Sequence, residues 1–262
     1  AKLYEDRGIT EDPNSLYEEP YFDEKTRELV QGKKKRMPTF SDFHNELEKM
    51  AEKEKDVDLK KLVNALRMFK KGGVYDLFDC ETSPELQNFH HAPIVTFDVS
   101  QLEESMLRPI GMYIALSWVW EKFAKKNPYI KKFIVFDEGW MMVSKNMAGS
   151  EFTGAFLETM ARRIRKRNGG ILVASQNFAE FAKNEYGRAV LTNSSINILL
   201  RQDAADIDEV QNVFKLSDGE RNFLLSAKRG EMLVKIGQES TVAYAMSFPF
   251  EHEMIEKSKK AS

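Results

Sequence analysis

The stretch KKFIVFDEGWMM, residues 131 to 142, decides the fold of this chain, because it joins an apolar run directly to two adjacent carboxylates. The run from Phe133 to Phe136 contains no polar side chain. Such a run is typical of a parallel strand that is covered on both faces of a sheet. It ends at Asp137 and Glu138. Two acids at the end of a buried strand indicate a ligand site at the carboxyl edge of an α/β sheet.

Two further apolar runs end in polar residues in the same way. ILVAS ends at Gln176, and INILL ends at Arg201, Gln202 and Asp203. Across residues 93–250 such runs alternate with helix-like stretches of about 10–20 residues, which predicts βαβ units and a mainly parallel sheet. Because parallel strands end at the same edge, we expect these polar ends and the acid pair to converge on one pocket.

The texture of the chain changes along its length. Residues 1–92 are charged and poor in strand-forming residues. After the basic run KKKR (33–36), apolar residues recur at the three- and four-residue spacing of a helix. This part of the chain is therefore predicted to be a mainly all-α subdomain with a linker. PIVTFDVS (93–100) is the first predicted strand of an α/β core over residues 93–250. GEMLVKIG and STVAYAMS are expected to form a hairpin at the edge of its sheet. Residues 251–262 are predicted to be a C-terminal tail.

Composition excludes several classes of protein. Hydrophobic residues make up 42% and charged residues 31% of the 262 residues, which is typical of a globular chain. The lone cysteine, Cys80, excludes an intrachain disulfide. The most membrane-like stretch runs from Pro109 to Trp120, shorter than the ~20 residues that a bilayer requires. The net charge of −2 provides no whole-chain field that would attract nucleic acid.

The acid pair has the pattern of a Walker B motif, which predicts an ATP site. Asp137 is the candidate ligand for Mg²⁺. Glu138 is the candidate that orients or deprotonates the water attacking the γ-phosphate. Gln176 can position water or sense that phosphate, since an amide both donates and accepts hydrogen bonds. Gln202 is a weaker candidate for binding the cofactor. The alternative is that these polar residues only end strands, cap helices or form turns.

A basic cluster, ARRIRKRNGG, lies between the first two of these strand candidates. Arg162 and Arg165 are the candidate arginine fingers, because a guanidinium against a transferring phosphoryl group stabilises its charge. Arg188 is a further candidate. The same cluster could instead contact nucleic acid, or could be the solvated C-terminus of a helix, where cations suit the helix dipole.

The phosphate-binding motif G-x-x-x-x-G-K-[ST] is missing from the sequence. Gly149 and Gly154 have the glycine spacing, but Ala155 and Phe156 follow them in place of lysine and serine or threonine. Without that lysine and the surrounding backbone amides, the phosphates lack their main anchor. We therefore expect this chain alone to bind ATP poorly.

Five stretches in order resemble the ATPase domain of the conjugative-transfer TraC/TrbE-type family, the large traffic ATPases of type IV secretion systems: RMPTFSDF, GGVYDLFD, FIVFDEGW, ARRIRKRNGGILVASQ and NILLRQD. The resemblance runs from about Arg36 to about Ile236. It implies a RecA-like P-loop NTPase core with an all-α subdomain, and ATP with Mg²⁺ as cofactors. It also implies a homo-oligomer, hexameric or dimeric, that docks at the cytoplasmic face of the membrane, with secretion-channel subunits and a coupling protein as partners.

Carried over by position, the resemblance matches Asp137 and Glu138 to Walker B, and Gln176 to the motif that follows RKRNGG. It places the Walker A segment before Ala1. The chain is then the C-terminal portion of an ATPase that couples ATP hydrolysis to substrate transfer or pilus assembly. Two alternatives stay open at this point: a non-catalytic docking module of a secretion machine, and a DNA-pumping motor of related fold.

Overall fold

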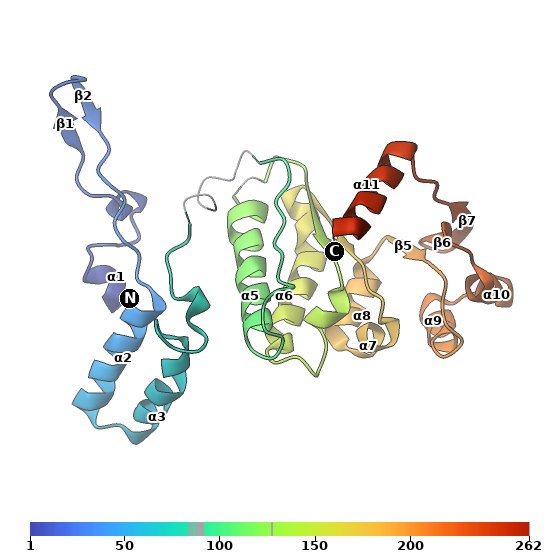
Figure 1. Ribbon diagram of the computed structural model, residues 1–262, viewed down its shortest axis with the longest axis horizontal. Helices are drawn as coiled ribbons and strands as arrows, with labels where there is room; N and C mark the ends of the chain where they lie inside the picture. The colour runs from blue at the N-terminus through green and yellow to red at the C-terminus, as the bar shows by residue number, and fades with distance from the viewer. Residues whose placement is uncertain (84–85, 87–91, 127, 262) are drawn as a thin grey trace. The chain divides into compact units, whose positions relative to one another are not determined.

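The computed structural model describes residues 1–83, 86, 92–126 and 128–261 (Figure 1). The chain divides into two compact units, unit 1 from Ala1 to Val95 and unit 2 from Thr96 to Ser262. The strand predicted over residues 93–100 is not formed, and this prediction was wrong. A strand requires a hydrogen-bonded neighbour, and within the described residues no strand pairs with this segment.

Two packed helices, α2 (Phe40–Glu54) and α3 (Val57–Leu66), form the main body of unit 1. Thr39 caps α2 in a capping box with Asp42. Lys55 ends α2 in the left-handed conformation, and Asp56 then caps α3. Shorter elements complete the unit: α1 (Lys2–Glu5) and 3-10 turns at Pro13–Leu16, Arg67–Phe69 and Asp76–Phe78.

Unit 1 also carries a β-hairpin that the sequence analysis did not predict. Strands β1 (Tyr21–Asp23) and β2 (Glu28–Val30) pair antiparallel. The turn between them places Arg27 at φ 56, a left-handed conformation that glycine or asparagine would normally signal. The run KKKR is not a free linker, because the chain at Lys33 and Lys35 bonds back to Glu18 and Leu16.

The core of unit 2 is the pair β3 (Lys132–Phe136) and β4 (Gly169–Val173), which are parallel and in register from Lys132↔Gly169 to Phe136↔Val173. This confirms the predicted parallel pairing of these two strands. Helix α6 (Ser150–Arg163) crosses between them, beside α5 (Leu107–Trp118) (Figure 1). A π-helical turn at Val119–Ala124 extends α5.

Among the residues that the structure describes, only one face of β3 is covered. Ile134 is buried in the main core with residues of α5, α6, α7 (Phe178–Lys183) and α8 (Glu185–Asn193). Phe133 and Val135, which point the other way, are each 60% exposed. The prediction that both faces are covered was therefore wrong for the chain as described. An apolar run shows only that each face is suited to burial.

The third apolar run forms β5 (Ile196–Leu199), which pairs antiparallel with β6 (Glu231–Ile236) rather than parallel with β4. Strand β7 (Glu239–Tyr244) closes this sheet as the predicted hairpin with β6. A second core lies between the sheet and helices α9 (Ile207–Phe214) and α10 (Asp218–Ser226). Helix α11 (Pro249–Ala261) ends the chain. Among the described residues, none of the helices combines the length and apolarity needed to cross a membrane.

Candidate functional site

The carboxyl ends of β3 and β4 are held side by side beyond the strands themselves. The amide of Ala174 donates to the Phe136 carbonyl at 2.8 Å, and the Gly139 amide donates to the Ala174 carbonyl at 2.7 Å. These two bonds continue the parallel ladder past Phe136. Asp137 and Glu138 are therefore positioned by the sheet rather than by a loose loop.

Glu138 has a backbone conformation that is unusual for a residue with a side chain. Its φ of 52° and ψ of 46° lie in the left-handed region, which costs roughly 1–2 kcal/mol for a non-glycine residue. The next residue, Gly139, is buried against β4, and a Cβ there would lie 2.3 Å from Cγ1 of Val173. The close approach at Gly139 and the left-handed Glu138 together turn the chain sharply at the strand end.

The Glu138 carboxylate is held by two side chains. Nε1 of Trp140 donates to Oε2 at 2.7 Å, and Nε2 of Gln176 donates to Oε1. Trp140 comes from the 3-10 turn Gly139–Met142, and Gln176 follows β4. The structure thus brings together two of the predicted site residues, Glu138 and Gln176, across the ends of adjacent strands.

Asp137 lies beside this contact and is exposed to solvent. Its Oδ1 accepts a hydrogen bond from the Glu138 amide at 3.1 Å. An exposed carboxylate suits Mg²⁺, which keeps several waters and is commonly bound through one or two protein carboxylates. Within the part of the chain that the structure describes, no group of three or more His, Cys, Asp or Glu side chains could hold a metal ion. The donor set therefore fits a hydrated Mg²⁺ on Asp137, not a caged metal.

Helix α7 begins two residues after Gln176 and is anchored by residues that the sequence analysis did not single out. The Asn177 side chain caps α7 by accepting from the Glu180 amide at 3.1 Å. The Glu180 carboxylate in turn accepts from Ser144 and from Asn177 Nδ2. Asn177 and Glu180, three residues apart, are a readable capping signal. The role of Trp140 had no such signal, because it depends on a side-chain orientation.

Gln202 does not join this group. Its side chain donates to the carbonyls of Leu200 and Arg201, at 3.0 and 3.2 Å. Its backbone amide donates to Leu224 of α10. The expectation that three parallel strand ends converge was wrong for this strand, because β5 belongs to the antiparallel sheet.

Arg162 and Arg165 lie at the opposite edge of the parallel pair from Glu138. Arg162 lies in the last turn of α6 and pairs with Glu158 at 2.7 Å, while Arg165 is exposed in the 3-10 turn Ile164–Arg167. That turn leads into the first residue of β4, whereas Glu138 follows the last residue of β3. Five residues of strand span about 16 Å. Neither arginine can therefore act as an arginine finger on a phosphate bound beside Glu138 of the same copy. Such a contact would have to come from a neighbouring copy. Arg188, the other candidate, donates through Nε to the Ala182 carbonyl at 2.8 Å.

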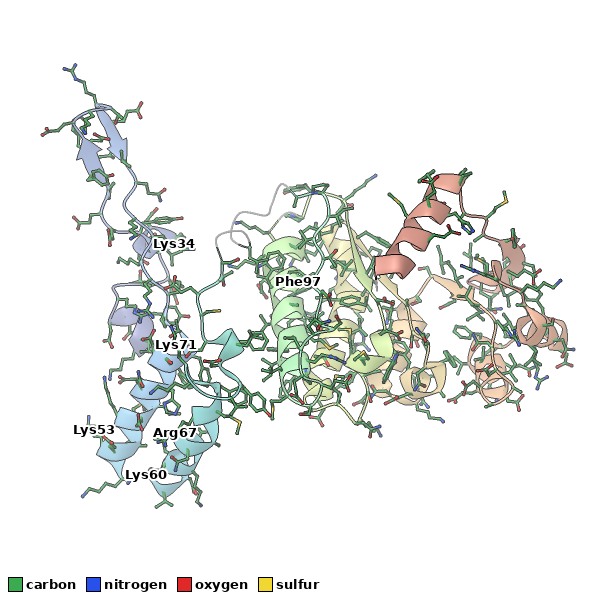
Figure 2. All side chains as sticks on the ribbon, in the orientation of Figure 1. Lys34, Lys53, Lys60, Arg67, Lys71 and Phe97 are labelled. Carbon is green, nitrogen blue, oxygen red and sulfur yellow. The ribbon has the colours of Figure 1, made fainter. Side chains whose placement is uncertain are left out.

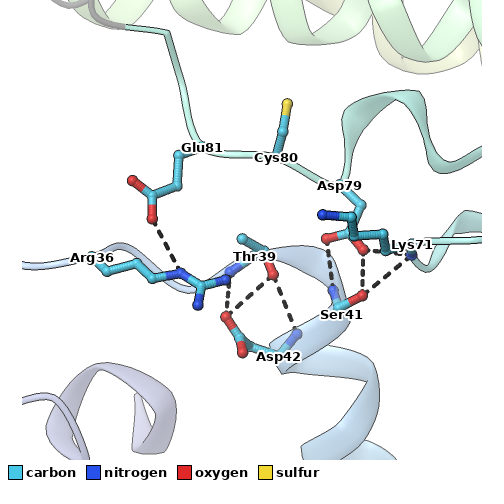
Figure 3. Close-up of a pocket in the computed structure, with 8 residues that line it drawn as sticks. All are labelled: Arg36, Thr39, Ser41, Asp42, Lys71, Asp79, Cys80 and Glu81. Atoms are coloured by element: carbon cyan, nitrogen blue, oxygen red, sulfur yellow. Dashed lines mark hydrogen bonds and ion pairs between the residues drawn. The ribbon is translucent and has the colours of Figure 1, made fainter.

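Unit 1 contains a separate pocket of about 290 Å³ whose lining is a hydrogen-bonded framework (Figure 3). The Asp79 carboxylate accepts from Ser41 and from the Lys71 amide. Burial alone would raise the pKa of Asp79, but these hydrogen bonds outweigh it and lower the pKa. Hydrogen bonds from the Thr39 backbone and then from Arg7 lower the pKa of Asp42 to about 2. These residues brace the start of α2, and we assign them a structural role.

The class of fold is P-loop NTPase-like. Its marks are two parallel strands with helices packed on one side, an acid pair at the end of one strand, and a glutamine after the other that is hydrogen-bonded to one of the acids. A family model described as the TraG P-loop domain matches residues 37–250. The chain belongs to this family, and thus to the ATPase-type proteins of conjugation and type IV secretion.

One solved structure, VirB4 of Thermoanaerobacter pseudethanolicus, superposes with a TM-score of 0.72 at 24% sequence identity. The match covers 96% of this chain and 63% of that one, so the chain spans less than two thirds of its structural relative. The likeness supports an α/β RecA-like core. Comparison with curated proteins gave no match.

Proposed function

We propose that this chain is the part of a type IV secretion ATPase that carries the hydrolytic acids, and that it couples ATP hydrolysis to substrate transfer or pilus assembly. The observation that carries the proposal is the hydrogen bond between Gln176 and Glu138 at the ends of β3 and β4. A bare surface acid would not require a backbone in the left-handed region and two side-chain donors. Such precise placement is what positioning of an attacking water requires.

In this proposal each residue has one task. Asp137 holds Mg²⁺ through its exposed carboxylate, and Mg²⁺ supplies neutralisation of the phosphate charge. Glu138 accepts the proton of the attacking water or orients it. Gln176 and Trp140 fix the direction of the Glu138 carboxylate. Binding of the β- and γ-phosphates requires a cradle that these 262 residues do not contain.

The test is Glu138→Gln in the complete protein that includes its phosphate-binding loop. We expect ATP binding to be retained and hydrolysis to fall by about 10²–10⁴-fold, the usual contribution of a positioned acid or base. Glu151→Gln is the matched control, because Glu151 is an exposed acid in the first turn of α6. Turnover like that of the wild type in Glu138→Gln would contradict the role of Glu138.

A docking module without catalysis is the second candidate, and the missing cradle favours it. In that case both Glu138 and Gln176 serve only to brace the strand ends. The complete wild-type protein would then neither bind nor hydrolyse ATP, and Glu138→Gln would lower its stability without changing any turnover. Docking at the membrane surface, with channel subunits and a coupling protein as partners, belongs to either proposal.

A further inference from the structure

The carboxylate of Glu180 bridges the segments that follow β3 and β4. Oγ of Ser144, two residues after the 3-10 turn that carries Trp140, donates to one of its oxygens. Nδ2 of Asn177, the residue after Gln176, donates to the other at 3.1 Å. Ser144 is only 3% exposed, so the first contact is costly to break, because a buried polar group without a partner carries the full cost of desolvation. One side chain thus ties the two strand-end segments together.

The position of Gln176 depends on this bridge, because its own backbone is held only from either side. Within the described part of the chain, the backbone of Ser175 and Gln176 makes no hydrogen bond. Before them, Ala174 continues the strand ladder. After them, the Asn177 side chain accepts from the Glu180 amide at 3.1 Å and donates to the Glu180 carboxylate. Glu180 therefore fixes one of the two anchors between which Gln176 lies.

We propose that Glu180 is a positioning residue for ATP hydrolysis, an inference that rests on the function proposed above. Its carboxylate holds the segments of Trp140 and Gln176 at a fixed separation, and those two side chains direct the carboxylate of Glu138. Glu180 acts through them and not on the reacting atoms. A misplacement of about 1 Å caused by a distant substitution can lower a rate by about 10²-fold. Loss of the bridge should therefore lower kcat and leave ATP binding unchanged.

The role requires a side chain of the right length and not a charge. Glu180→Asp keeps the charge but is a methylene too short to reach Ser144 and Asn177 together. Glu180→Gln loses the charge, but its amide can accept from Asn177 and donate to Ser144. In the complete protein we expect Glu180→Asp to lower kcat by about 10–100-fold and to change the KM for ATP by less than about twofold. Glu180→Gln should recover most of that loss.

Two exposed residues provide the controls. Glu185→Ala removes an acid from the first turn of α8, so it matches the effect of a lost charge on a helix dipole. Lys60→Ala changes α3 of unit 1 (Figure 2). Both should keep the kcat of the wild type. A kcat of Glu180→Asp equal to that of the controls would overturn the proposal. Equal losses in Glu180→Asp and Glu180→Gln would overturn it as well, because the bridge would not explain them.

A double substitution shows whether Glu180 acts through Glu138. In a Glu138→Gln background, Glu180→Asp should lower the residual turnover by less than about twofold, because the carboxylate that it helps to direct is gone. A loss as large as in the wild-type background would contradict the role. Turnover like that of the wild type in Glu138→Gln alone defeats the proposed function. If Glu138→Gln is impaired and Glu180→Asp is not, only the role of Glu180 fails.

The indole N–H resonance of Trp140 reports the same arrangement without any turnover. It can be observed in protein labelled with ¹⁵N-tryptophan and assigned with Trp140→Phe. Glu138→Gln should shift this resonance, because the acceptor of the indole loses its charge. We expect Glu180→Asp to shift it in the same direction and Glu185→Ala to leave it in place. An unmoved resonance in Glu180→Asp would show that the bridge does not position Trp140.

Discussion

The side-chain amide of Gln176 donates a hydrogen bond to the carboxylate of Glu138, and this contact joins the ends of two parallel strands. The left-handed backbone at Glu138 and the parallel pairing of the two strands set the positions of both residues. The hydrogen bond holds both side chains in orientation, the carboxylate of Glu138 and the amide of Gln176. The pair is therefore the centre of the candidate site, with Asp137 at its exposed side.

Gln176→Ala removes one of the two donors on Glu138. In the complete ATPase we expect kcat to fall by about 10–100-fold, since a hydrogen bond to a charged group contributes about 1.5–3 kcal/mol. ATP affinity should change little. Gln202→Ala is the matched control and should leave kcat near that of the wild type, because Gln202 donates only to nearby carbonyls. Steady-state kinetics on both variants decides the matter; equal losses would contradict the different placement of the two glutamines.

Gly139→Ala places a methyl group where Val173 already lies, with 2.3 Å between the new Cβ and Cγ1. Valine has little freedom to move away, so we expect a loss of about 1–3 kcal/mol in the free energy of unfolding, measured by urea denaturation. Adding Val173→Ala should recover part of it. Gly219→Ala in α10 is the control and should not destabilise, because the nearest atom to its Cβ is 4.0 Å away. An unchanged midpoint for Gly139→Ala would show that the strand end can shift freely.

Asp42 makes the stability of unit 1 dependent on pH. Its pKa is lowered from 3.8 to about 2 in the folded chain. A lowered pKa contributes stability that is present above about pH 4 and is lost as the pH falls through about 2. We expect Asp42→Asn to cost about 2 kcal/mol at pH 6, with the gap from wild type shrinking below pH 4.

Unfolding followed at several pH values measures that gap. Asp58→Asn is the control for Asp42→Asn, because Asp58 also pairs with a cation, Lys61, but its side chain is 89% exposed. It should cost far less at pH 6, as exposed ion pairs contribute about 0–1 kcal/mol. A gap for Asp42→Asn that stays constant down to pH 2 would contradict the assignment.

Local signals in the sequence predicted the parts of the fold that local energetics determine. The run at 133–136 and the run ILVAS at 171–175 each predict a strand, and the helix between them supplies the long connection that a parallel pair needs. By contrast, the apolar pattern of INILL is the same whether the neighbouring strand is parallel or antiparallel. The pairing of β5 with β6 could therefore not be predicted. The hairpin was missed because Arg27, not glycine, occupies its left-handed position.

For the candidate site, the sequence placed Asp137, Glu138 and Gln176 at one edge because parallel strands end together. Arg162 and Arg165 precede β4 in the chain and therefore lie at the starting edge of the parallel pair, a placement that chain order implies and that the sequence analysis did not state. The clamp from Trp140 was beyond sequence reasoning. An indole two residues after an acid has no fixed direction until the backbone of Glu138 is known.

The left-handed backbone at Glu138 determines which substitutions give clean measurements there. Glutamate and glutamine share the same branching and length, so exchanging one for the other leaves the conformational penalty intact and isolates the charge. Glycine would remove that penalty, and a β-branched residue would enlarge it. Kinetic losses from either would mix altered chain geometry with lost chemistry, and only the isosteric amide separates the two.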